Sequence, residues 1–121
     1  MNRVTEGNPG AAAAGIAVTD LRSALQLLAS LPGELVSTDV EIDANAEISG
    51  VYRHVGAGGT CMRPTRKGPA MLFNNVKGYP GVRVAIGLLS TRQRVGRLLG
   101  CPPERLGFLL KDSVQHPVPP V

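Results

Sequence analysis

Aromatic side chains are scarce in this sequence of 121 residues, where they account for 3% of the chain and tryptophan is absent. A core has to be built mainly from leucine, valine, isoleucine and alanine, and the hydrophobic content of 43% is sufficient for that. A chain of this length forms one domain with a single modest core. The scarcity of rings also disfavours binding of single-stranded nucleic acid, because bases stack on such rings.

The sequence also has few cysteines and no long apolar run. The two cysteines, Cys61 and Cys101, lie far apart and form no C-x-x-C motif. This spacing favours two reduced thiols, and one disulfide stays open as an alternative. No apolar run approaches the roughly 18 residues that span a membrane. The Ala-rich run at 11–18 follows the acidic Glu6, which argues against a signal peptide. We therefore expect a cytoplasmic protein that does not contact a membrane.

The first part of the chain carries a helix signal followed by a strand signal. Residues 1–18 hold little large apolar surface and are expected to form a flexible N-terminal arm. Thr19 or Asp20 caps a helix that runs to about Leu31, in which leucines recur at helical spacing. Residues 34–42 alternate between apolar and polar, which predicts a strand with one buried side. The residues expected on that side are Val36, Thr38, Val40 and Ile42.

A second helix is expected after a cap at Asp43 or Asn45. Its apolar residues have the spacing i, i+3, i+4, i+7, and the glycines between 56 and 59 should end it. The stripe consists of Ile48, Val51, Tyr52 and Val55. Residues 60–68 then form a basic surface loop.

The most tightly specified stretch follows that loop. The short apolar runs at 70–76 and 82–88 predict two buried strands, and the Gly-Tyr-Pro-Gly sequence between them predicts a turn. Ser90 and Gln93 form a capping box at the start of a helix, and Gly100 ends that helix.

A last helix is expected to begin near Pro102, because proline is tolerated in a first turn. Its apolar stripe consists of Leu106, Leu109, Leu110 and Val114. The proline-rich residues 116–121 predict an extended tail. About three or more strands and about four helices indicate an α+β (mixed α/β) fold, in which helices cover a small sheet and the folded domain occupies residues 19–115.

No catalytic constellation is visible. His54 and His116 have no second ligand at metal-binding spacing, so structural or surface roles are favoured. Cys61 lies in the basic loop, but no histidine–acid pair can be named for it. The glycines at 56–59 lack the residues of a Walker loop and the strand–helix context of a dinucleotide loop. The sequence therefore predicts no catalytic, cofactor-binding or metal-binding residue in this chain.

The charge balance is mildly basic. Lysine and arginine total 13 against 9 acidic residues, a formal net charge of +4. Such an excess suits nucleic acid, an acidic partner or a carboxylate substrate, and selects none of them. Arg92, Arg94 and Arg97 share one short helix near Arg83, which indicates a solvated helix face or, as the alternative function, a stand-alone basic binding protein for nucleic acid or an acidic partner. Nucleic acid is not the expected partner, because no helix-turn-helix or zinc-finger pattern is present.

Four motifs, in order, resemble the N-terminal domain of UbiD-family decarboxylases. They are DLRSAL and LPGEL within residues 20–35, VEID and EI within 40–48, PAMLFNNVKG at 69–78 and RQRVGRLLG at 92–100. The PVPP sequence at 117–120 is similar to the proline-rich exit from that domain. The resemblance covers residues 19–121.

Members of that family carry out reversible, non-oxidative decarboxylation of aromatic or α,β-unsaturated acids, using prenylated FMN, a divalent metal and potassium. The resemblance places the cofactor and the catalytic Glu-Arg-Glu network beyond the N-terminal domain, so no such residue is assigned here. It implies an accessory subunit in a hetero-oligomer with a catalytic UbiD-like subunit that holds the cofactor; a detached N-terminal domain is the alternative. Alone, the chain is not expected to be a decarboxylase.

Under the accessory-subunit hypothesis, basic and proline-rich residues form the candidate partner interface. Polyproline segments suit such a role because they lose little entropy on docking. The residues are Arg63, Arg66, Lys67, Arg92, Arg94, Arg97, Pro117, Pro119 and Pro120.

Overall fold

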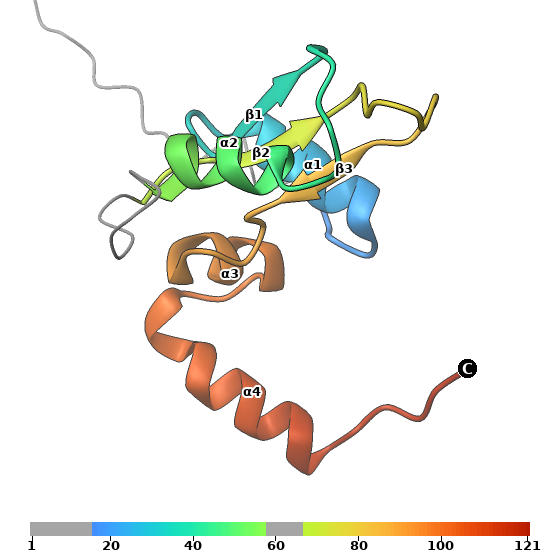
Figure 1. The fold of residues 1–121 in the computed structure, drawn as a ribbon. Coiled ribbons are helices and arrows are strands. Elements are labelled where there is room, and N and C mark those ends of the chain that lie inside the picture. The colour runs from blue at the N-terminus through green and yellow to red at the C-terminus, as the bar shows by residue number, and fades with distance from the viewer. Residues whose placement is uncertain (1–15, 58–66) are drawn as a thin grey trace, which may run out of the picture.

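A three-stranded sheet with helices packed on it forms the body of the protein (Figure 1). The computed structural model describes residues 16–57 and 67–121. The α+β class predicted from the sequence is confirmed. The elements are α1 (Leu21–Ser30), β1 (Leu35–Thr38), α2 (Glu47–Ala57), β2 (Ala70–Phe73), β3 (Val84–Ile86), α3 (Arg92–Leu99), the 3₁₀ turn η1 (Pro103–Arg105) and α4 (Leu106–Gln115).

The central strand is β2, and all four of its residues are buried. It pairs in parallel with β1 and antiparallel with β3. The predicted turn between β2 and β3 is confirmed, because Gly78 and Gly81 have φ values of 79° and 77° that suit glycine. The amide of Tyr79 donates to the carbonyl of Val76 at 3.0 Å and fixes the start of this turn.

Helices cover both faces of the sheet, with α2 in front of it and α1 behind it in Figure 1. Neighbouring residues of a strand point to opposite faces. Met71 and Phe73 therefore face α2, where Ile48 completes the main core cluster, and Phe73 is fully buried. Behind the sheet, α1 packs against β1 through its buried side, Ala24, Leu27 and Leu28.

The strand predicted over residues 34–42 is shorter than expected. Only Leu35–Thr38 is paired as a strand, and Val36 and Val40 are 41% and 74% exposed. Val40 is exposed because the chain leaves the sheet after Thr38, whose hydroxyl accepts from the amide of Val40 at 3.3 Å. Val36 lies within β1, but β1 is an edge strand and this side chain is only partly covered there. Ile42 alone is buried as expected, next to Val76 in an isolated bridge.

One of the predicted helix caps is confirmed and another is wrong. The Asp20 carboxylate accepts from the amide of Ser23 at 2.7 Å and forms a capping box at the start of α1. The cap of α3 is Thr91 rather than Ser90, since the Thr91 hydroxyl accepts from the amide of Arg94 at 3.1 Å. The predicted end of α3 at Gly100 is confirmed by its left-handed conformation.

The C-terminal helix α4 projects beyond α3, away from the sheet (Figure 1). The first turn predicted at residues 102–104 is the 3₁₀ turn η1, and α4 begins only at Leu106. Leu106 is buried, but Leu110 and Val114 are 56% and 80% exposed. The described part of the chain therefore covers only the first turn of the apolar stripe.

Candidate functional site

The three arginines of α3 differ in exposure, and only Arg94 is buried. Arg94 has a side chain that is 3% exposed, and its Nε donates to Glu34 Oε2 at 2.9 Å. Its Nη1 donates to the carbonyl of Gly87 and to the hydroxyl of Ser90, both at 2.8 Å, and its Nη2 donates to the carbonyl of Gly68 at 2.8 Å. The guanidinium thus joins α3 to three loops at the end of the sheet.

Arg97 completes this buried network from the surface side. Its Nη1 donates to Glu34 Oε1 at 2.7 Å, so Glu34 holds two arginines at once. The sequence identified both arginines as interface candidates and did not identify Glu34. Glu34 is separated from Arg94 by 60 residues, and no local signal indicates such a pairing. The burial of Arg94 removes its side chain from the surface of this chain.

The remaining basic candidates lie apart from that network. Lys67 and Arg92 are exposed and line a pocket of about 420 Å³ with Pro103 and residues at the start of α3. Arg92 also donates from Nη2 to the carbonyl of Pro103 at 3.4 Å. The other two basic candidates, Arg63 and Arg66, and the cysteine at 61 lie outside the described residues.

The proline-rich tail and α4 present several apolar side chains to solvent. Pro117, Pro119 and Pro120 are exposed, as expected for an extended tail. Leu110 and Val114, which we call the α4 patch, extend the stripe that begins at the buried Leu106. Contiguous apolar surface that is exposed to solvent is a feature of interaction sites. Because α4 contacts mainly η1, nothing in the described residues covers this patch.

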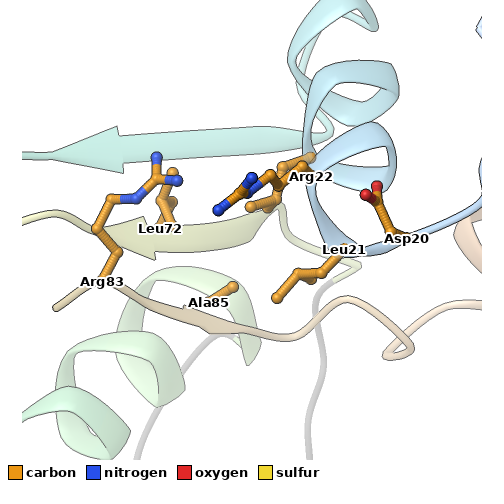
Figure 2. A pocket seen from close by; sticks show the side chains of 7 residues that line it. Asp20, Leu21, Arg22, Leu72, Arg83 and Ala85 are labelled. Carbon is orange, nitrogen blue, oxygen red and sulfur yellow. The ribbon is translucent and has the colours of Figure 1, made fainter.

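A second surface feature lies between α1 and β3. A pocket of about 390 Å³ has Leu72 and Ala85 among the residues that line it, and Leu21 and Leu25 contribute from α1. Arg22 and Arg83 flank it, and Figure 2 shows both side chains reaching over the sheet face that carries Leu72. The sequence drew attention to Arg83, as part of a basic surface, but gave no reason to pair it with Arg22.

The described residues contain no group of three or more histidine, cysteine or acidic side chains that could hold a metal. The pKa of Asp20 is lowered, chiefly by the hydrogen bond from the amide of Ser23, which is a helix-capping effect. Among the helices of the described residues, none is long and apolar enough to cross a membrane.

Comparisons with known proteins agree with this architecture. The family described as "3-octaprenyl-4-hydroxybenzoate carboxy-lyase N-terminal domain" (UbiD_N) matches residues 28–113. A gallate decarboxylase of Lactiplantibacillus plantarum is 52% identical over 101 residues, which are 84% of this chain and 21% of the relative.

Solved structures give the same result. The apo structure of a 3,4-dihydroxybenzoic acid decarboxylase from Enterobacter cloacae is 53% identical, with a TM-score of 0.75 over 87% of this chain and 22% of that one. The corresponding enzyme of Klebsiella pneumoniae is 50% identical, also with a TM-score of 0.75, over 85% and 21%.

The family match extends over most of the chain, and this chain therefore belongs to the UbiD family through its N-terminal domain. It spans about one fifth of the length of the decarboxylases it matches. The resemblance described from the four sequence motifs is confirmed.

Proposed function

We propose that this chain acts as a small, non-catalytic accessory subunit of a UbiD-type decarboxylase that acts on aromatic or unsaturated acids. In this role it docks on a separate catalytic UbiD-like subunit in the cytoplasm. The observation that carries the proposal is the α4 patch, because Leu110 and Val114 continue a core-forming stripe and are 56% and 80% exposed. Fully burying one such side chain is worth about 1.5–3 kcal/mol, so a partner that covers both gains appreciable affinity.

The similar proteins support a catalytic decarboxylase subunit as the proposed partner. They are decarboxylases of gallate and of 3,4-dihydroxybenzoate, and this chain corresponds to about a fifth of each. A catalytic chain that supplies the remaining domains would provide the apolar surface that covers the α4 patch. The exposed candidates Lys67 and Arg92 and the proline tail are further contacts in this proposal.

The cofactor is assigned to that partner. Prenylated FMN with a divalent metal and potassium is the group that the family implies, and metal ions require several convergent oxygen or nitrogen ligands. The described residues offer no such set of acidic or histidine ligands, so they do not fit the metal. No residue of this chain is assigned to the cofactor, and no catalytic step is routed through it.

The alternative of a stand-alone basic binding protein has less support. It relied on four arginines, of which Arg94 is buried and Arg97 is paired with Glu34. Their charges are partly neutralised within the fold, so the basic surface of α3 is smaller than the sequence indicates.

The proposal is tested by co-expressing the tagged chain with a catalytic UbiD-like subunit of the same organism. Affinity purification, a visible spectrum and a decarboxylation assay of the eluate are the measurements. We expect the catalytic subunit to co-elute with flavin absorbance and to lose activity when this chain is omitted. Recovery of the chain alone, with full activity of the catalytic subunit in its absence, would contradict the proposal.

A further inference from the structure

The pocket between α1 and β3 combines an apolar surface with two positive charges. Leu72 and Ala85 come from neighbouring strands and are partners across the sheet. Leu21 and Leu25 add aliphatic side chains from α1. None of these four side chains carries a polar atom, so this surface recognises a ligand by shape and apolar contact alone. Its volume of about 390 Å³ accommodates a single-ring or similarly sized organic molecule.

Two arginines, Arg22 and Arg83, also line this pocket. In Figure 2, the side chains of Arg22 and Arg83 extend from different elements over the strand that carries Leu72. Within the described residues, neither guanidinium has a hydrogen bond or ion pair to another side chain. This contrasts with Arg94 and Arg97, whose charges are matched by Glu34.

One carboxylate lines the same pocket, and it is already engaged. Asp20 lines the pocket, but its Oδ1 accepts from both the amide and the hydroxyl of Ser23 at 2.7 Å as the cap of α1. The charge of Arg22 contributes only a smaller part of the lowered pKa of Asp20. Two positive charges that line one pocket both attract an anion bound there. Arginine is well suited to this, because its planar group donates two parallel hydrogen bonds to a carboxylate.

We propose that this pocket binds a small organic carboxylate, with the carboxylate between Arg22 and Arg83 and an apolar body against Leu72 and Ala85. Because the apolar side chains are aliphatic, the site accepts saturated and aromatic bodies alike. This site goes beyond the docking role proposed above. It involves neither α4 nor a partner subunit.

The test uses the full chain and titrates it with cyclohexanecarboxylate, with binding followed by calorimetry and by amide chemical shifts. We expect saturable binding, with shifts concentrated at the start of α1, at Leu72 and in β3. The neutral isostere cyclohexanecarboxamide should bind at least about tenfold more weakly, because each hydrogen bond to a charged group contributes appreciably. Acetate, which has the charge without the apolar body, should also bind more weakly.

Matched variants separate this site from general attraction of anions. R22Q and R83Q should each weaken binding about tenfold, while both variants keep the fold, since the two side chains are exposed. The control is K111Q, which removes the same charge from an exposed position on α4. Binding that is absent, that is equal for the amide, or that falls as much in K111Q as in R83Q would overturn the proposal. None of these outcomes depends on whether the chain docks on a catalytic subunit.

Discussion

Replacing Arg94 with methionine tests whether the buried guanidinium organises this fold. Methionine preserves much of the length and apolar stem of arginine but donates no hydrogen bond. The carbonyls of Gly68 and Gly87 would lose the Arg94 donors that lie at 2.8 Å. Glu34, whose side chain is 17% exposed, would retain only its contact with Arg97.

The expected loss is large for a domain of this size. Removing one partner of a buried ion pair costs about 3–5 kcal/mol, because the other charge stays buried without compensation. Arg97 still compensates Glu34 in part, so we expect a value near the lower end, about 3 kcal/mol. Domains typically have about 5–15 kcal/mol of stability in total. The melting temperature should fall by roughly 12 °C or more.

Urea unfolding followed by circular dichroism measures this loss. The matched control is R92M, a change on the same helix at an exposed side chain whose hydrogen bond to the carbonyl of Pro103 is 3.4 Å long. That control should stay within about 0.5 kcal/mol of the unmodified chain. A loss below about 1 kcal/mol for R94M, or an equal loss for R92M, would refute the reasoning.

Three further predictions concern the cap, a close approach and the core. D20A should lower stability at neutral pH. The difference should shrink as the pH falls from about 4, near the ordinary pKa of aspartate, through the lowered pKa of Asp20, because protonation of the folded carboxylate removes this contribution. A pH-independent difference in urea unfolding would argue against this. G87A should lower the free energy of unfolding by about 1–3 kcal/mol more than G33A does. Both positions have positive φ, but of the two only at Gly87 would a Cβ collide with the ring of Tyr52. Equal losses of stability in thermal melts would disprove the collision. F73A should lose about 3–5 kcal/mol in urea unfolding, because Phe73 is fully buried, and a loss below 1 kcal/mol would exclude a central role for this ring.

Much of the fold could be predicted because local signals coincide with tertiary packing. The stripe of α2, the turn between β2 and β3 and the end of α3 at Gly100 follow from residue spacing and from glycine conformation. The strand predicted over residues 34–42 was too long, because periodicity cannot show where a strand leaves its sheet. The predicted cap of α3 was wrong by one residue. Ser90 and Thr91 can both cap a helix, but the hydroxyl of Ser90 accepts a hydrogen bond from Arg94 and Thr91 is the cap.

The candidate sites depended on long-range contacts that the sequence does not display. A cluster of arginines on one helix looks like a basic surface, but Glu34 from a distant loop pairs with two of them. Arg22 and Arg83 line the same pocket because α1 and β3 both border it. Of the stripe predicted for α4, only Leu106 is buried, because periodicity cannot show what covers a helix.

The central claim is that the α4 patch docks on a catalytic UbiD-like subunit. The most direct measurement is sedimentation velocity of the catalytic subunit mixed with this chain, with an L110D/V114D variant or with the control variant K111Q. Both side chains of the patch are exposed, so the double variant should fold normally. Our account predicts a complex with the unmodified chain and with K111Q, and a weakening of at least about a hundredfold for L110D/V114D. Equal binding of the double variant, or no complex with the unmodified chain, would contradict it.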